Sequence, residues 1–186
     1  MPGYLEPVEL VHPTTPELEA GLDAIRHSPA DRGRVEQIVR RPAVDEREAL
    51  TEAQLDTVEG LVGDSWSRRR PDPETQVTLM NARVAALVSG SDDRWQLAGD
   101  QLYVDLDLSR TNLPPGTRLT IGDHGAVIEI TAEPHTGCRK FAGRFGMDAA
   151  RFVNSREGRE LQLRGINAKV VLPGAVRVGD PVRKLE

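Results

Sequence analysis

From Arg34 onward, the chain alternates between short apolar segments and turns rich in glycine and proline. Alternating apolar residues predict half-buried strands, and turns this closely spaced favour hairpins over the helical crossovers that parallel strands need. We therefore expect a mainly β fold with a few short helices, as a barrel or a sandwich. The expected strands are Val35–Val39, Gln76–Leu79, Leu102–Leu106, Leu119–Ile121 and Val127–Ile130, and the turns lie at 114–116, 122–125, 173–174 and 179–180.

Three places have the signals of helix ends. Pro and a hydroxyl or amide residue before an apolar periodic run predict a helix start. One face of the first helix would carry Leu18, Leu22 and Ile25. The expected helices are an N-terminal one begun by Thr15 and Pro16, residues 82–88 capped by Asn81, and a pair at 138–145 and 148–153 around Gly146.

The composition limits the cellular setting. Of the 186 residues, 38% are apolar and 28% charged, which is enough apolar material for a folded domain. No apolar stretch is long enough to cross a bilayer and no basic-then-apolar leader opens the chain, so we expect a cytoplasmic protein that neither enters a membrane nor is exported. A single cysteine excludes an internal disulfide and a multi-thiolate zinc site, and it suits a reducing compartment.

The charge is distributed unevenly. The net charge is −5, yet residues 134–170 hold eight basic and three acidic side chains. A local basic surface indicates an anionic ligand, whereas the overall acidity argues against nucleic-acid binding. The alternative is a solvated face in which the bases pair with Asp148, Glu157 and Glu160.

The only cysteine, Cys138, lies where an expected strand leads into an expected helix. A thiol in the first turn of a helix, beside Arg139 and Lys140, should ionise more easily than a free cysteine. Gly137 would let an anionic group approach the backbone closely. Two alternatives remain open: Cys138 is a buried packing residue, and His135 is either its general base or a surface group.

Several segments along residues 33–186 together resemble the MOSC domain, named for the C-terminal portion of molybdenum-cofactor sulfurases. Each segment is short, but their order and spacing match the family. Two departures occur: Gly99-Asp100-Gln101-Leu102 stands where many relatives have Gly-Glu-Asn-Leu, and Gly137-Cys138 where they have Pro-Cys. The matching segments are 33–38, 41–42, 60–64, 76–81, 99–102, 119–122, 135–141, 164–168 and 176–180.

The resemblance implies a largely antiparallel β-barrel domain over residues 33–186, preceded by a short extension with one helix over residues 1–32. In relatives, a pocket cysteine ligates molybdenum of the pterin cofactor or is proposed to carry persulfide sulfur. Only Cys138 can take that part here, as catalytic residue and metal ligand. The cofactor, molybdopterin, would then be bound by Thr136, Gly137, Arg139, Lys140, Arg144 and Arg151.

Three functions follow as hypotheses. The first is a molybdenum-dependent oxidoreductase acting on small N-hydroxylated substrates with an external electron donor. The second is a sulfur carrier that receives persulfide sulfur on Cys138 from a donor protein. The third is a non-catalytic barrel that binds another anion. The family is also associated with pyridoxal phosphate, for which the sequence offers no residues.

Overall fold

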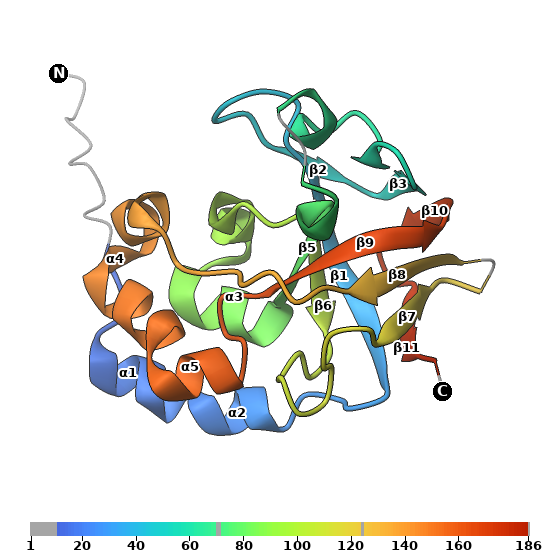
Figure 1. Ribbon diagram of the computed structural model, residues 1–186. Coiled ribbons are helices and arrows are strands. Elements are labelled where there is room, and N and C mark those ends of the chain that lie inside the picture. The colour runs from blue at the N-terminus through green and yellow to red at the C-terminus, as the bar shows by residue number, and fades with distance from the viewer. Residues whose placement is uncertain (1–10, 70–71, 124, 186) are drawn as a thin grey trace, which may run out of the picture.

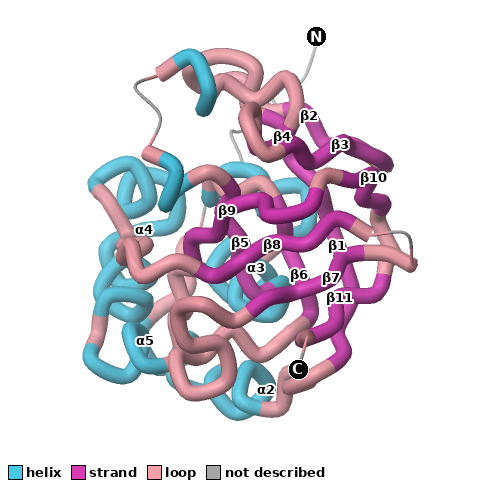
Figure 2. The backbone as a smooth tube through the Cα atoms, turned by 45° about the vertical axis from the view of Figure 1, so that its right-hand side comes forward, coloured by secondary structure: helices cyan, strands magenta, loops and turns pink. Residues whose placement is uncertain are grey.

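The computed structural model describes residues 11–69, 72–123 and 125–185. The α-helices gather on one side of the molecule and the strands on the other (Figures 1 and 2). The helices are α1 Thr15–Ala20, α2 Leu22–Arg26, η1 Trp66–Arg68, η2 Pro73–Thr75, α3 Ala82–Ser89, η3 Asp92–Ala98, α4 Arg139–Asn154 and α5 Arg156–Glu160. The strands are β1 Arg32–Arg40, β2 Glu48–Leu50, β3 Glu52–Asp56, β4 Gly60–Leu61, β5 Val77–Asn81, β6 Leu102–Asp105, β7 Arg118–Ile121, β8 Ala126–Ile130, β9 Ile166–Leu172, β10 Gly174–Arg177 and β11 Pro181–Lys184.

Seven strands close into a barrel. The pairing runs β1, β11, β7, β8, β9, β5, β6 and back to β1, while β2 is added at the edge of β1. The pairing of β5 with β6 is parallel because α3 and η3 form the crossover between them, and the other barrel pairings are antiparallel. Strands β10, β3 and β4 form a small separate sheet. The barrel confirms the predicted fold class, and each predicted strand is present.

Two apolar cores explain why the barrel carries helices on one side. Alternate residues of the strands point into the barrel, as Ile38, Leu79 and Val104 do. The residues between them, such as Met80 and Tyr103, belong to a second core that the helices cover. Strand β5 is therefore buried on both faces along its whole length.

The helices follow the predicted signals with two adjustments. The side chain of Asn81 accepts a hydrogen bond from the backbone N–H of Arg83, as expected for the cap of α3. The N-terminal helix is capped by Thr14 rather than Thr15, and it divides into α1 and α2 at Gly21. Its apolar face packs as predicted, since Leu18 is fully buried in the second core.

Helix α4 bends at Gly146, where the backbone has φ 90° and ψ 163°. Two helical runs therefore meet at this glycine, as the sequence predicted. β1 begins at Arg32, beside the predicted boundary between extension and domain, although that division of the chain stays a prediction. Within residues 11–69, 72–123 and 125–185, no helix is long and apolar enough to span a bilayer.

Gly165 allows β9 to approach β5. Its φ of +108° is rarely adopted by other residues, and an added Cβ would lie 2.3 Å from the carbonyl oxygen of Leu79. We predict that Gly165→Ala lowers the free energy of unfolding by at least about 3 kcal/mol, because both backbone strain and a clash result. The control is Gly90→Ala, where φ is +72° and an added Cβ meets open space. This control should cost only about 1 to 2 kcal/mol in urea unfolding, and equal losses would contradict the steric argument.

Candidate functional site

Cys138 is an exposed thiol at the start of α4. Its own backbone is extended, and its carbonyl oxygen accepts the first helical hydrogen bond from the N–H of Ala142. Partial burial raises the pKa of Cys138, but the backbone N–H groups of Phe141 and Lys140 and the charge of Arg164 lower it by more. The net shift is downward, so the thiolate is favoured as the sequence predicted. The alternative of a sealed packing residue is wrong, because the residue is exposed.

The loop that carries Cys138 is fixed by one side chain. The N–H of Gly137 donates to Oδ1 of Asn154 at 3.0 Å, and Nδ2 of Asn154 donates to the carbonyl of Gly137 at 2.9 Å. A Cβ at position 137 would lie 2.9 Å from Asn154 and from Val153. A proline here would lack the N–H donor. These contacts give a physical reason for a glycine, and against a proline, before the cysteine.

Beneath this loop lies a buried ionic cluster. Arg164 donates to Oδ2 of Asp100 at 2.6 Å and to the carbonyl of Ala98 at 2.8 Å. Nε2 of His135 lies 2.9 Å from the other oxygen of Asp100. The guanidinium carbon of Arg164 is 5.1 Å from the centre of the Phe141 ring, a cation–π distance. The cluster thus joins the starts of β6 and β9, the His135 loop and α4.

Electrostatics sets the charge of each member of the cluster. Burial would raise the pKa of Asp100, but Arg164 and His135 outweigh it and hold that pKa at about 2. Burial and the charge of Arg164 lower the pKa of His135, against the opposing effect of Asp100. The cluster therefore holds an ionised Asp100 and Arg164 with a histidine that favours its neutral form.

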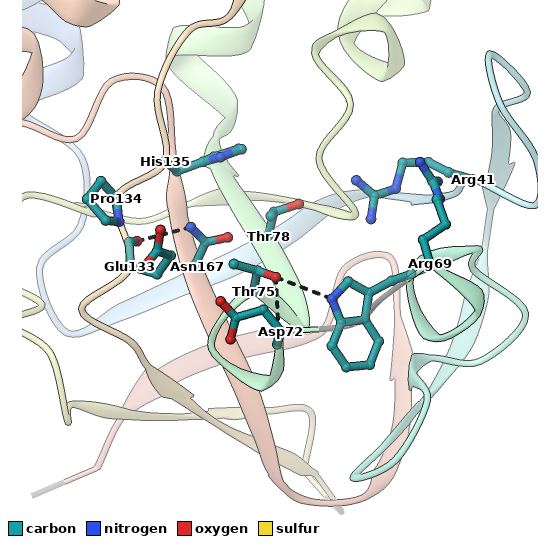
Figure 3. A pocket seen from close by; sticks show the side chains of 10 residues that line it. Arg41, Arg69, Asp72, Thr75, Thr78, Glu133, Pro134, His135 and Asn167 are labelled. Carbon is teal, nitrogen blue, oxygen red and sulfur yellow. Dashed lines mark hydrogen bonds between the residues drawn. The ribbon is translucent and has the colours of Figure 1, made fainter.

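A first cavity, the Arg41 cavity, has a volume of about 370 Å³ and opens beside His135 (Figure 3). Arg41 is held there by Asp64 at 2.9 Å and by the carbonyl of Gly99 at 2.7 Å. Its lining combines basic, acidic and hydrogen-bonding groups, which suits a polar heterocyclic ligand. The lining residues are Arg41, Trp66, Arg69, Asp72, Thr75, Thr78, Glu133, Pro134, His135 and Asn167.

A second cavity, the Arg110 cavity, has a volume of about 230 Å³ and shares Pro134 and His135 with the first. Thr136, two residues before the thiol, is in its wall, whereas Cys138 is not among the residues that line either cavity. The lining residues are Arg110, Pro134, His135, Thr136, Val153, Asn154, Gly158, Arg159, Gln162, Arg164 and Gly165.

The basic residues predicted as cofactor contacts do not converge on one site, and only Lys140 and Arg144 come together. Lys140 and Arg144 both pair with Asp45, at 3.7 and 3.1 Å, and Arg139 is exposed at the first turn of α4. Arg151 pairs with Asp148 and lines a different cavity, formed by α1, α4 and α5. Thr136 and Gly137 do lie at the thiol loop, with Thr136 facing the Arg110 cavity.

The sequence analysis did not predict that Arg164 and Asp100 form a buried ion pair beneath the thiol loop. Both lie in segments that carried the family resemblance, and that was the available signal. The sequence predicted that the charges of Arg139 and Lys140, next to the thiol, would lower its pKa. In the structure the side-chain charge that lowers the pKa of Cys138 is that of Arg164, which is 26 residues away in the chain. No cluster of three or more metal-ligating side chains occurs among the residues that the structure describes.

Comparison with known proteins gives one family. The profile described as MOSC domain matches residues 73–183, more than half of the chain. No protein with a curated description matches. Several solved structures share the fold, among them the three that follow.

The YUAD protein from Bacillus subtilis has a TM-score of 0.62 at 16% identity, and the match covers 82% of this chain and 95% of that one. YiiM from Escherichia coli has a TM-score of 0.54 at 19% identity, covering 82% and 70% of the two chains. YiiM from Geobacillus stearothermophilus has a TM-score of 0.56 at 11% identity, covering 83% and 75%. At these identities the likeness shows the fold alone.

The buried ion pair predicts a specific acid sensitivity. Because the pKa of Asp100 is about 2, below the value of about 3.9 for an unfolded aspartate, the pair stabilises the fold above about pH 4. This contribution should be lost as the pH falls through about 2. Asp100→Asn should lower the free energy of unfolding at pH 7 by about 3 to 5 kcal/mol, because it leaves Arg164 buried without its partner.

The matched control is Asp105→Asn, which breaks a partly exposed pair with Arg83. We expect this variant to lose only about 1 kcal/mol or less. Urea unfolding at pH 7 and between pH 4 and 2 measures both effects. Equal losses in the two variants would show that burial of the Asp100 pair does not matter.

The thiol predicts a second pH effect. We expect the alkylation rate of Cys138 to rise with a midpoint below that of glutathione measured alongside, since a free cysteine has a pKa of about 8.5 and that of Cys138 is lowered. Stopped-flow iodoacetamide labelling from pH 5 to 10 gives the midpoint. A midpoint equal to or above that of glutathione would contradict the local electrostatics.

Proposed function

Since the chain belongs to the MOSC domain family, we propose that it binds the molybdenum cofactor and uses it as an oxidoreductase on small N-hydroxylated substrates. In this proposal Cys138 is the molybdenum ligand. The observation that carries it is an exposed thiol with a lowered pKa, at the start of a helix and near a buried arginine.

The donor chemistry of the site fits this cofactor. A thiolate is a soft ligand suited to a transition metal, and described side chains offer no separate metal cluster. The Arg41 cavity offers hydrogen-bonding groups for the edges of a pterin, from Arg41, Thr75, His135 and Asn167. Thr136 and Gly137 would support the ligand from the thiol loop.

The proposed reaction needs both electrons and protons. Reduction of an N-hydroxyl group consumes two electrons and two protons and releases water. The bound cofactor supplies the redox chemistry, and an external donor supplies the electrons. His135 is held through Nε2 by Asp100 and lines the Arg41 cavity, so its other ring nitrogen would take up a proton and pass it to a substrate bound there.

The test is the metal content of protein purified from a host that makes the cofactor. We expect close to one molybdenum per chain in the wild type and a loss of at least about tenfold in Cys138→Ser, because a hydroxyl is a hard and poorly ionised ligand. Amidoxime reduction with a chemical electron donor should fall in parallel. Val58→Ser is the control, since Val58 is an exposed apolar residue on the turn between β3 and β4.

Other outcomes would overturn the proposal. Cyanide-labile sulfur on Cys138 without molybdenum would favour the sulfur carrier, which the same exposed thiolate could serve. Absence of both signals, with wild type and Cys138→Ser alike, would leave a barrel that binds another ligand.

A further inference from the structure

We propose that the Arg110 cavity is a binding site for a phosphate monoester. It is separate from the thiol and from the Arg41 cavity, although His135 lies between the two cavities. The inference goes beyond the redox reaction, because it rests on the charge and construction of this cavity alone.

The first argument is charge. Three arginines line the Arg110 cavity, and none of its described lining residues is acidic. Arg164 is neutralised by Asp100, which leaves the positive charges of Arg110 and Arg159. Neither forms an ion pair with any residue that the structure describes. Two uncompensated guanidinium groups facing one small cavity favour a doubly charged oxyanion.

The second argument is that the acids nearby are already engaged. Glu160 pairs with Arg156 at 3.5 Å, Glu157 pairs with Arg26, and the carboxylate of Asp107 accepts from Ser109. By contrast, the Arg41 cavity includes Asp72 and Glu133 in its lining. The Arg110 cavity is therefore the more attractive of the two for a phosphate.

The third argument is that both arginines are set on fixed backbone. The N–H of Arg110 donates to the carbonyl of Glu160 at 3.0 Å, which ties the loop after β6 to the end of α5. Nε of Arg159 donates to the carbonyl of Asn154 at 2.9 Å, so its two terminal nitrogens remain available to a ligand. Preorganised donors lose less entropy when they bind an anion.

The fourth argument concerns the wall of the cavity. Arg164 is buried there, and its Nε is a donor with no partner within the described part of the chain. Thr136 adds a hydroxyl from the thiol loop, and Asn154, which fixes that loop, lines the same cavity. A phosphate bound here would therefore lie close to the reactive loop without touching the sulfur.

A phosphate monoester could come from two sources with the same chemistry. One is the terminal phosphate of the pterin cofactor, and the other is a phosphate group on the substrate. The basic residues predicted as cofactor contacts, Arg139, Lys140, Arg144 and Arg151, do not line this cavity. Either source would use Arg110 and Arg159 in their place.

The test uses the full chain purified without cofactor, titrated with inorganic phosphate by isothermal calorimetry. We expect the double variant Arg110→Gln/Arg159→Gln to bind phosphate at least about tenfold more weakly than wild type, because two charge-assisted contacts are lost. The control is Arg118→Gln/Arg177→Gln, which removes the same charge from two exposed arginines, on β7 and β10, that pair with Glu129 and Glu52. Thermal unfolding checks that each variant is folded.

The control should bind phosphate as wild type does. Equal binding by the Arg110/Arg159 variant and wild type, or no phosphate binding by wild type, would overturn the proposal. Cys138→Ser should bind phosphate normally even though it loses molybdenum, so failure of the redox proposal and failure of this one give different results.

A second measurement identifies the source. In the cofactor-competent host, loss of molybdenum from the Arg110/Arg159 variant would assign the site to the phosphate of the cofactor. Retained molybdenum, with a raised KM for a phosphorylated substrate and an unchanged KM for its dephosphorylated form, would assign it to the substrate. Retained molybdenum with no difference between the two substrates would count against a role in catalysis by either source.

Discussion

The buried ion pair between Asp100 and Arg164 is the contact on which the candidate site depends. Asp100 precedes β6 and Arg164 precedes β9, and between them they fix His135 and the Phe141 face of α4. Burial of two charges is costly, and here it is compensated by short, well-directed hydrogen bonds to each partner. Loss of either charge would leave the other buried and unpaired.

The same pair also sets the chemistry above it. The charge of Arg164 lowers the pKa of Asp100, of His135 and of Cys138, which lie on three different segments. One buried cation thus favours an ionised carboxylate, a neutral histidine and a thiolate at the same place. His135 lines two cavities. The Arg41 cavity is lined by polar groups of both charges, and the Arg110 cavity is strongly basic.

Local signals were read correctly where the physical cause is local. Alternation of apolar residues predicted five of the seven barrel strands, all but β9 and β11, Asn81 caps α3 as predicted, and α4 bends at Gly146. The cap at Thr14 was misread as Thr15, a shift of one residue that pattern reasoning cannot resolve. The lowered pKa of Cys138 was predicted from its place before a helix, because the helix N-terminus acts within one turn, whereas its exposure was left open.

The sequence by itself determined the β-rich fold, the single thiol and the family resemblance, since each depends on residues that are close together or in a fixed order. Only the tertiary structure decided which cations matter. Lys140 and Arg144 lie two and six residues after the thiol, but both pair with Asp45, whereas the charge of Arg164, 26 residues away in the chain, acts on the thiol in the folded barrel. The effect of a charge depends on its distance in space. Closure of a barrel brings residues close together in space, and their separation along the chain does not predict this.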